Sequence, residues 1–221
     1  MKNTITCLLL LISTLAFSQQ GQIQFGINYS EDNIAGSDYL ITDGNANGYS
    51  LSNREHNYTL GLSFQYGFTE NFSLTTGVSY NNKDVKGGYN CATCYYHHLT
   101  AITNYIVIPE RIKQRYLAIP IIVQFAPLHT RLYPTIHAGI VNNFSVENEF
   151  ENEQSYLQEG QFGLGVGYKI IKHLNVELQY AYRTAFTKVY QDLDVQPAHT
   201  DYEPNKLNTN SVGLRVNYIL K

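Results

Sequence analysis

The stretch FGLGVGYKIIKHLNVELQYAYR, from Phe162 to Arg183, carries the pattern that predicts the fold. Apolar residues alternate with glycine in its first arm and with polar residues in its second. The apolar faces consist of Phe162, Leu164, Val166 and Tyr168, then Leu174, Val176, Leu178, Tyr180 and Tyr182. Successive side chains of a strand point to opposite faces of a sheet, so this alternation predicts two β-strands. We expect Ile170 to His173 to form the turn of a hairpin.

The same alternation recurs along the chain and predicts the remaining strands. Their ranges are Ile23 to Ser30, Tyr58 to Thr69, Phe72 to Asn81, Gln114 to Phe125, Arg131 to Asn143 and Val212 to Leu220. With the two arms of the hairpin, the expected total is eight. Pro120 is awkward inside its strand, because proline lacks a ladder donor and normally marks an edge or a bulge.

The connections between these strands alternate between long and short. The long ones are Glu31 to His56, Asp84 to Lys113, Phe144 to Gly160 and Thr184 to Asn210. Bacterial outer-membrane barrels have an even number of antiparallel strands, short periplasmic turns and long extracellular loops. The sequence therefore predicts an all-β fold, an antiparallel transmembrane β-barrel of eight strands with four long extracellular loops. The segment Ala101 to Ile108 also looks extended and leaves a ten-stranded barrel as an alternative.

Alternation alone does not decide which face points outward, because a soluble lipocalin-like barrel alternates with its apolar face inside. Here the non-apolar faces are mainly Gly, Ser, Thr, Gln and Asn, and charged residues are 15% of the chain. A soluble exterior would carry more Lys and Glu. The composition and the one-sided loop lengths favour an apolar face toward lipid, with a soluble secreted ligand-binding barrel as the alternative.

The first residues have the pattern of a cleaved signal peptide. Lys2 supplies the positive charge, Ile5 to Phe17 the apolar core and Ala16-Phe17-Ser18 the cleavage site. We expect residues 1–18 to be removed and residues 19–221 to form a single barrel domain in the cell outer membrane. Past the signal, no apolar run approaches the roughly 18 residues that a membrane helix requires.

One constellation has metal-ligand residue types: Cys91 and Cys94, followed by His97 and His98. Two thiolates and two imidazoles could close a zinc site, but adjacent histidines cannot easily face one ion. A redox C-x-x-C needs a helix N-terminus to lower a thiol pKa, and no helix is predicted here. In an oxidising compartment a local disulfide between Cys91 and Cys94 is the favoured interpretation, with metal and redox roles as alternatives.

A polar cluster is expected inside the barrel. Its members are the polar-face residues Glu177, Gln179, Arg183 and Arg215, with Asn217, Lys169 and His137 in the vicinity. The interior of an eight-stranded barrel is just wide enough to be filled by side chains, and buried charges require partners. The sequence therefore favours a structural cluster over a conducting or catalytic one.

Several motifs carry a family resemblance. They are Ala16-Phe17-Ser18-Gln19-Gln20, Tyr116-Leu117-Ala118-Ile119-Pro120-Ile121, the strand around Gly139, Gly163-Leu164-Gly165-Val166-Gly167 and Val176-Glu177-Leu178-Gln179-Tyr180. In these motifs the chain resembles the small outer-membrane β-barrel proteins of Bacteroidetes called PorT-like. The resemblance covers nearly the whole mature chain. It implies a barrel fold and a place in the outer membrane, and no particular activity.

The sequence does not predict an enzyme or a cofactor. A catalytic barrel would need a nucleophile, a base and an orienting acid near one strand end, and no histidine has such companions. A net charge of -3 and the lack of nucleic-acid signatures argue against nucleic acid as a partner. We expect a non-enzymatic outer-membrane protein whose loops serve surface interaction or envelope integrity. The alternatives are a role as an accessory of protein secretion and an outer-membrane enzyme that acts on lipid or peptide. The expected partners are outer-membrane lipid, envelope or secretion proteins and extracellular ligands.

Overall fold

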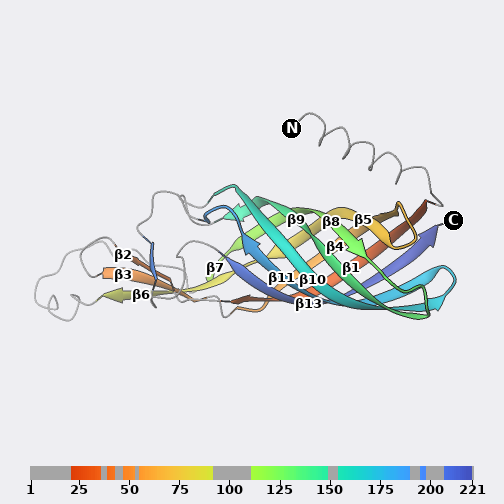
Figure 1. Ribbon diagram of the computed structural model, residues 1–221. Coiled ribbons are helices and arrows are strands. Elements are labelled where there is room, and N and C mark those ends of the chain that lie inside the picture. Colours follow the sequence, from red (N-terminus) through yellow and green to blue (C-terminus); the bar gives the residue numbers. More distant parts are fainter. Residues whose placement is uncertain are drawn as a thin grey trace, which may run out of the picture.

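Eight strands form a closed antiparallel barrel in the order β1-β13-β11-β10-β9-β8-β5-β4 (Figure 1). The computed structural model describes residues 21–35, 39–42, 47–52, 55–91, 111–148, 154–189, 195–197 and 207–220. The barrel strands are β1 (Gln22–Ala35), β4 (Asn57–Gly67), β5 (Phe72–Asn82), β8 (Gln114–Phe125), β9 (Leu132–Asn148), β10 (Tyr156–Ile171), β11 (Leu174–Ala185) and β13 (Asn208–Leu220). The predicted eight-stranded barrel is confirmed. No helix in the described part of the chain is long and apolar enough to cross a membrane.

The barrel closes by pairing its first strand with its last. β1 and β13 are hydrogen-bonded in register from Ile23 opposite Leu220 to Ala35 opposite Asn208. The ten-stranded alternative is therefore wrong, because the eight strands close on themselves without a contribution from Ala101 to Ile108. That segment lies outside the described residues, as does the predicted signal peptide, residues 1–18.

A second, smaller sheet lies beyond the end of the barrel opposite the short turns (Figure 1). It has five strands in the order β12-β2-β3-β6-β7, with β12 (Val195–Pro197), β2 (Tyr39–Thr42), β3 (Asn47–Ser52), β6 (Val85–Cys91) and β7 (Arg111–Ile112). These strands fall in segments that the sequence predicts to be loops. Their residues are mixed in polarity, and apart from β2 with β3 their partners are distant in sequence, so period-two alternation does not find them.

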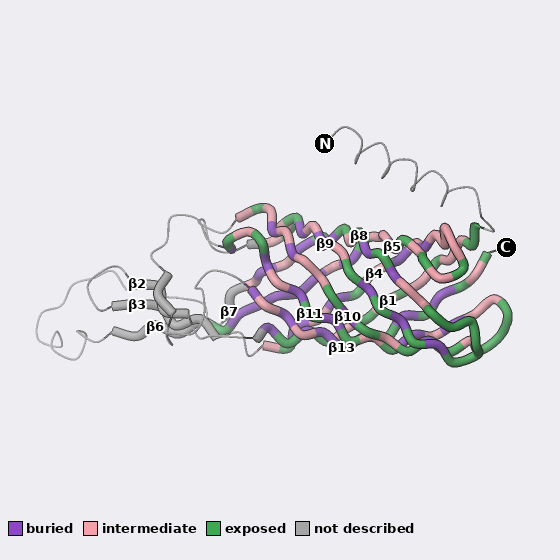
Figure 2. Tube along the Cα trace, viewed as in Figure 1, coloured by how far each residue is buried: buried purple, intermediate pink, exposed green. Residues whose placement is uncertain are grey.

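The outer surface of the barrel is apolar. Leu62 is 66% exposed and Ile27 is 59% exposed, whereas the residues that alternate with them along the strands are more deeply buried (Figure 2). A soluble barrel would bury these side chains, so the alternative of a soluble secreted barrel is wrong. The observed arrangement suits a hydrocarbon exterior, where a closed barrel satisfies every backbone hydrogen bond.

Aromatic side chains mark the two edges of this apolar surface. Toward the small sheet, Tyr58 contacts Tyr29 and Tyr80, with ring centroids 6.4 and 6.3 Å away, and Phe144 contacts Tyr156 at 5.3 Å. Toward the turns, Phe72 contacts Phe125 at 4.7 Å and Phe68 at 6.3 Å. The strand from Phe72 to Tyr80 spans roughly 21 Å at about 3.4 Å per residue and a tilt of about 40°. This is close to the apolar band, about 25 Å tall, of outer-membrane barrels.

The strands extend beyond the aromatic edge nearer the small sheet, and along β1 the polarity of the two strand faces reverses there. Polar side chains such as Asp84, Gln114 and Thr209 are buried at this level. So are six apolar side chains: Ile34, Val85, Leu157, Ala185, Val189 and Leu207. The outward side chains Glu31, Asn33 and Lys86 are polar and exposed. We call this part the loop-side extension and the six buried residues the apolar cap. Buried apolar and exposed polar side chains are typical of β-structure in water, so the reversal marks the membrane boundary.

Two local features of the sequence are explained by the packing. A Cβ on Gly163 would overlap the ring of His137, and one on Gly167 would overlap Tyr133. The glycine face of β10 therefore makes room for large inward side chains of β9. The pairing between β5 and β8 is interrupted opposite Pro120. The gap lies between the residue pair Thr76–Ile121 and the residue pair Ser79–Ala118. This fits the irregularity that the missing N–H predicts.

Candidate functional site

The lumen of the barrel contains two separate layers of charged side chains. The sequence groups Glu177, Gln179, Arg183 and Arg215 into one cluster, and the structure divides them. Glu177 and Arg215 are direct neighbours on β11 and β13, whereas Arg183 lies six residues further along β11. Six residues of strand correspond to about 20 Å, so Arg183 belongs to a different level of the lumen.

The layer nearer the turns is centred on the carboxylate of Glu177, which is almost fully buried. Gln124 Nε2 donates to its two oxygens at 3.1 and 3.2 Å, and Thr135 Oγ1 donates to Oε1 at 2.5 Å. Arg215 Nη1 is 3.9 Å from Glu177 Oε2. Arg215 also donates to Gln124 Oε1 and to Gln179 Oε1, both at 3.2 Å. The charge of Glu177 is thus compensated by an ion pair and three hydrogen-bond donations.

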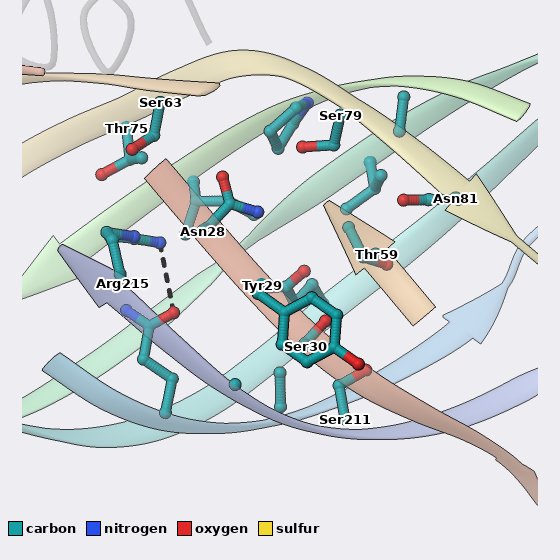
Figure 3. Close-up of a pocket in the computed structure, with 18 of the residues that line it drawn as sticks. Asn28, Tyr29, Ser30, Thr59, Ser63, Thr75, Ser79, Asn81, Ser211 and Arg215 are labelled. Atoms are coloured by element: carbon teal, nitrogen blue, oxygen red, sulfur yellow. Dashed lines mark hydrogen bonds between the residues drawn. The ribbon is translucent and has the colours of Figure 1, made fainter. Parts of the chain in front are cut away.

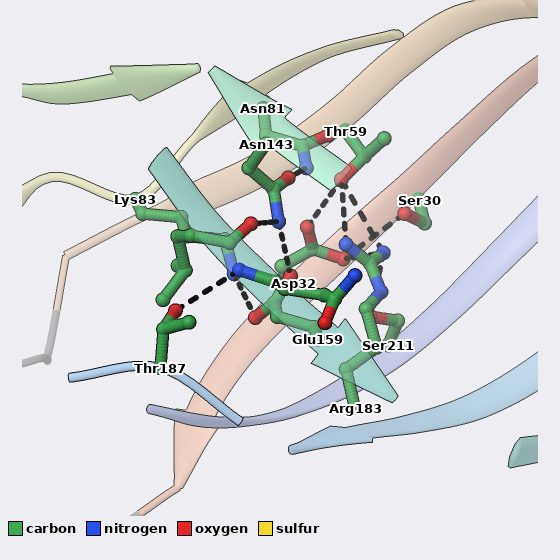
Figure 4. Close-up of polar contacts among 12 residues, drawn as sticks. Ser30, Asp32, Thr59, Asn81, Lys83, Asn143, Glu159, Arg183, Thr187 and Ser211 are labelled. Atoms are coloured by element: carbon green, nitrogen blue, oxygen red, sulfur yellow. Dashed lines mark hydrogen bonds and ion pairs between the residues drawn. The ribbon is translucent and has the colours of Figure 1, made fainter. Parts of the chain in front are cut away.

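The layer nearer the loops contains two buried ion pairs (Figure 4). Arg183 Nη2 lies 3.3 Å from Asp32 Oδ1 and donates to Ser211 Oγ at 3.1 Å. Lys83 pairs with Glu159, and the side chains of both are fully buried. Together these four charged groups fill the lumen just below the apolar cap.

Neutral side chains add further hydrogen bonds to this layer. Asn143 Nδ2 donates to Glu159 Oε2 at 2.9 Å, and Asn81 Nδ2 donates to Asn143 Oδ1 at 2.8 Å. Thr59 and Ser30 donate to the carboxylate of Asp32. The two ion pairs therefore stand in a connected polar network rather than as isolated charges.

Sequence reasoning missed Asp32, Lys83 and Glu159. Each lies at or beyond a predicted strand end: the strand before Asp32 was expected to end at Ser30, and the one before Lys83 at Asn81. The alternation of side chains along the strand could have identified them, because Asn28, Ser30 and Asp32 point to the same face. Continuing that alternation into the polar segments would have placed all three charges in the lumen.

Between the two layers lies a cavity of about 80 Å³. Figure 3 shows hydroxyl groups of Ser63, Thr75 and Ser79 around it, and Ala118 and Ile122 supply an apolar wall. At about 30 Å³ per water this volume suits two or three waters. A much larger vestibule of about 1010 Å³ lies at the turn end, with Gln124, Tyr133 and Glu177 among its lining residues. The Glu177 layer separates the vestibule from the small cavity.

The other predicted lumen residues lie on the inner face of the barrel. Lys169 Nζ is 5.6 Å from the ring centroid of Tyr133 and donates to the carbonyl oxygen of His129 at 3.1 Å. It therefore stands at the vestibule mouth. His137 and Asn217 are almost fully buried, on β9 and β13. Neither contacts Glu177 through a hydrogen bond among the described residues.

The cysteine and histidine constellation lies mostly outside the part of the chain that the structure describes. Cys91 is the last residue of β6, and Cys94, His97 and His98 lie outside the described residues. Within the described ranges, no three residues of the His, Cys, Asp or Glu types are grouped so as to hold a metal ion. The disulfide between Cys91 and Cys94 and the alternative metal and redox roles stay predictions.

The closed barrel with its outward apolar surface is matched by a family comparison. The sequence model of the outer membrane protein beta-barrel domain matches residues 4–219. The chain belongs to this family. The protein is thus an integral protein of the cell outer membrane, in contact with membrane lipid. The finer resemblance to PorT-like proteins of Bacteroidetes stays a prediction.

Solved structures show similar barrels at low sequence identity. Neisserial surface protein A is 9% identical, with 90% of this chain and 97% of that chain covered and a TM-score of 0.48. The N-terminal β-barrel domain of Pseudomonas aeruginosa OprF is 11% identical over 91% and 100%, with a TM-score of 0.46. The outer membrane protease OmpT from Escherichia coli is 10% identical over 90% and 96%, with a TM-score of 0.39. No curated protein matches in a sequence comparison. These likenesses concern the fold.

Proposed function

We propose that this outer-membrane protein is a non-enzymatic surface protein whose loop-side extension binds a partner outside the cell. The observation that carries the proposal is the structure built above the membrane boundary. There the barrel strands continue around the apolar cap, and the five-stranded sheet lies beyond them. Loops on a rigid scaffold are the usual place for binding residues.

The lumen supports the same conclusion. Two charged layers and the apolar cap lie across it, and every charged group in these layers is paired with a group of opposite sign. Side chains in such an arrangement stabilise the barrel rather than line a path for solutes. The function is therefore expected at the outer surface, not along the axis.

The catalytic alternative lacks a constellation in the described chain. His137 is buried in the lumen, and His129 lies at a short turn, 2.6 Å from Asn71 Oδ1. A serine or cysteine nucleophile within reach of a histidine and an acid is what acyl transfer requires. No such group occurs among the described residues, which supports a binding role.

The test removes two strands of the small sheet and keeps the barrel. Replacing residues 36–54 with a short Gly-Asn connector removes β2 and β3. The control shortens the β9–β10 connection, residues 149–153, a range that includes none of the strands assigned to that sheet. Cells that display each variant are compared for adhesion to a panel of glycan- and protein-coated surfaces. Gel mobility in SDS with and without boiling shows that each barrel is folded.

We expect the first variant to lose adhesion while the control keeps it. Equal adhesion by both folded variants would contradict the proposal. In that case, co-purification of the protein with a secretion complex would favour the role in protein secretion.

A further inference from the structure

The turn end of the barrel carries a group of basic side chains on one side. Arg131 directly precedes β9, Lys169 lies near the end of β10, and Lys172 and His173 form the turn to β11. The β4–β5 turn instead exposes Glu70, whose side chain is 93% exposed. The turn end is therefore not uniformly charged. Its basic residues gather at the adjacent strands β9, β10 and β11.

Arg131 is held in a fixed place at this edge. Its guanidinium carbon is 5.0 Å from the ring centroid of Tyr168, and its Nε donates to the carbonyl oxygen of Lys169 at 3.3 Å. Lys169 N donates in return to the carbonyl oxygen of Arg131 at 2.8 Å. Tyr168 is on the lipid face, so the guanidinium lies on the outside of the barrel. Its two Nη groups have no hydrogen-bond partner among the described residues.

The neighbouring turn adds further positive charge and an exposed apolar surface. A register shift between Lys169 and Ile171 interrupts the alternation, and both Ile170 and Ile171 are exposed, Ile171 by 62%. Lys172 follows directly and is exposed. On the far side of the turn the ring of His173 stacks on Tyr218 at a centroid distance of 6.2 Å. Exposed cationic and apolar side chains are thus neighbours at the turn between β10 and β11.

Apolar side chains lie directly beside these cations. Leu132 follows Arg131 on β9, points to the lipid face and stands opposite Tyr168 in the β9–β10 register. The arrangement matches a molecule with an anionic head and an apolar tail. A guanidinium binds phosphate oxygens through two parallel N–H groups, and an exposed isoleucine surface suits an acyl chain.

We propose that Arg131 and Lys172 form a site for the phosphate headgroup of an anionic phospholipid in the leaflet that faces the turns. Leu132, Tyr168 and Ile171 contact the part of the acyl chain that is nearest the headgroup. A free phosphate ion would use the cations but not the apolar surface. The site is separate from the loop-side extension, so it stands or falls independently of the proposed function.

The test is native mass spectrometry of the full-length protein released from detergent, titrated with phosphatidylglycerol or phosphatidylcholine. The variants are Arg131→Gln, Lys172→Gln and their combination. Lys86→Gln and Lys188→Gln are matched controls, since both lysines are exposed at the loop side of the barrel. Heat-dependent gel mobility confirms that each variant is folded.

We expect wild-type protein to retain phosphatidylglycerol in preference to phosphatidylcholine. Each basic residue near a membrane surface contributes on the order of 1 kcal/mol, so each substitution should weaken phosphatidylglycerol retention about fivefold. Arg131→Lys should lose part of the binding, because it keeps the charge and loses the planar fork. The two loop-side controls should bind as the wild type does.

Three outcomes would overturn the proposal. One is equal retention of the two lipids by wild-type protein, which needs no variant and so does not depend on folding of the substituted chains. Another is equal phosphatidylglycerol retention by the combined variant and by Lys86→Gln. A third is displacement of phosphatidylglycerol by millimolar inorganic phosphate, which would show that the cations bind the free anion and not the lipid.

Discussion

The membrane band of the barrel and its loop-side extension use the same strands with opposite polarity. In the band Ile27 points outward to lipid and Asn28 inward. Only a few residues further along β1, Asn33 points outward and Ile34 inward. The backbone geometry does not change between them, so the solvent around the strand decides which face is apolar. The charged layer nearer the loops lies at this reversal.

The largest effect is expected from breaking the ion pair just below the reversal. Lys83→Met leaves the carboxylate of Glu159 buried without its cation. Removing one partner of a buried pair costs about 3 to 5 kcal/mol. Urea unfolding of the protein in lipid vesicles measures this loss. The combined variant Lys83→Met with Glu159→Leu should recover most of it, and a double variant as unstable as the single one would contradict the interpretation.

A second variant tests the apolar cap. Ile34→Ala removes a buried side chain of the loop-side extension and should lower the free energy of unfolding by about 2 to 5 kcal/mol. Its neighbour provides the control, because Asn33→Ala changes an exposed position and should stay within about 0.5 kcal/mol. Equal effects at both positions would mean that the extension has no core of its own.

A charged substitution on each outer surface compares the two regions directly. Leu178 is 56% exposed on the lipid face, so Leu178→Arg should cost about 2 to 4 kcal/mol. Asn33→Arg places the same side chain on the outer face of the extension, where water solvates it, and should cost little. Folding yields into vesicles, followed by the heat-dependent gel shift, measure both. Similar yields would contradict the assignment of the membrane boundary.

The smallest effect concerns pH at the rim beyond the loop-side aromatic edge. Glu147 accepts from Arg115 Nη1 at 2.6 Å and from Lys113 Nζ at 3.3 Å. Partial desolvation raises the pKa of Glu147, but the hydrogen bond from Lys113 and the charge of Arg115 outweigh it, and the net shift is downward. A lowered pKa in the folded state gives stability that is present above the ordinary carboxylate pKa and lost as the pH falls through the folded value.

Glu147→Gln should therefore remove a small pH-dependent part of the stability. Unfolding curves of wild-type and variant protein, measured at several pH values, should differ near neutral pH and converge under acidic conditions. A difference that grows as the pH falls would have the wrong sign for this pair.

Alternation in the sequence predicts the membrane band well, because lipid imposes one rule on every outward position. All eight strands and the lipid-facing side follow from it. The strand ends do not follow, since polar residues such as Glu31 mark a loop in one solvent and an outward strand position in another. The small sheet is also missed, because β2 and β12 pair across more than 150 residues of chain.

The lumen is predictable only along neighbouring strands. Glu177 and Arg215 share a face and a register, so strand parity places them together. Thr135 reaches Glu177 from β9, which is separated from β11 by β10, and Gln124 reaches it from β8. Contacts across a barrel depend on tilt and side-chain length, which alternation does not encode.

The seam between β1 and β13 joins the two ends of the chain, and this sets the order of events in folding. Ile23 pairs with Leu220, so the contact that closes the cylinder spans nearly the whole sequence. Loop-closure entropy makes such a contact slow, and it cannot form before the last strand has been delivered. Until then β1 and β13 each present a row of unpaired N–H and C=O groups, as every sheet edge does. The assembly machinery must therefore shield these two edges. The barrel closes only when the last strand pairs with the first.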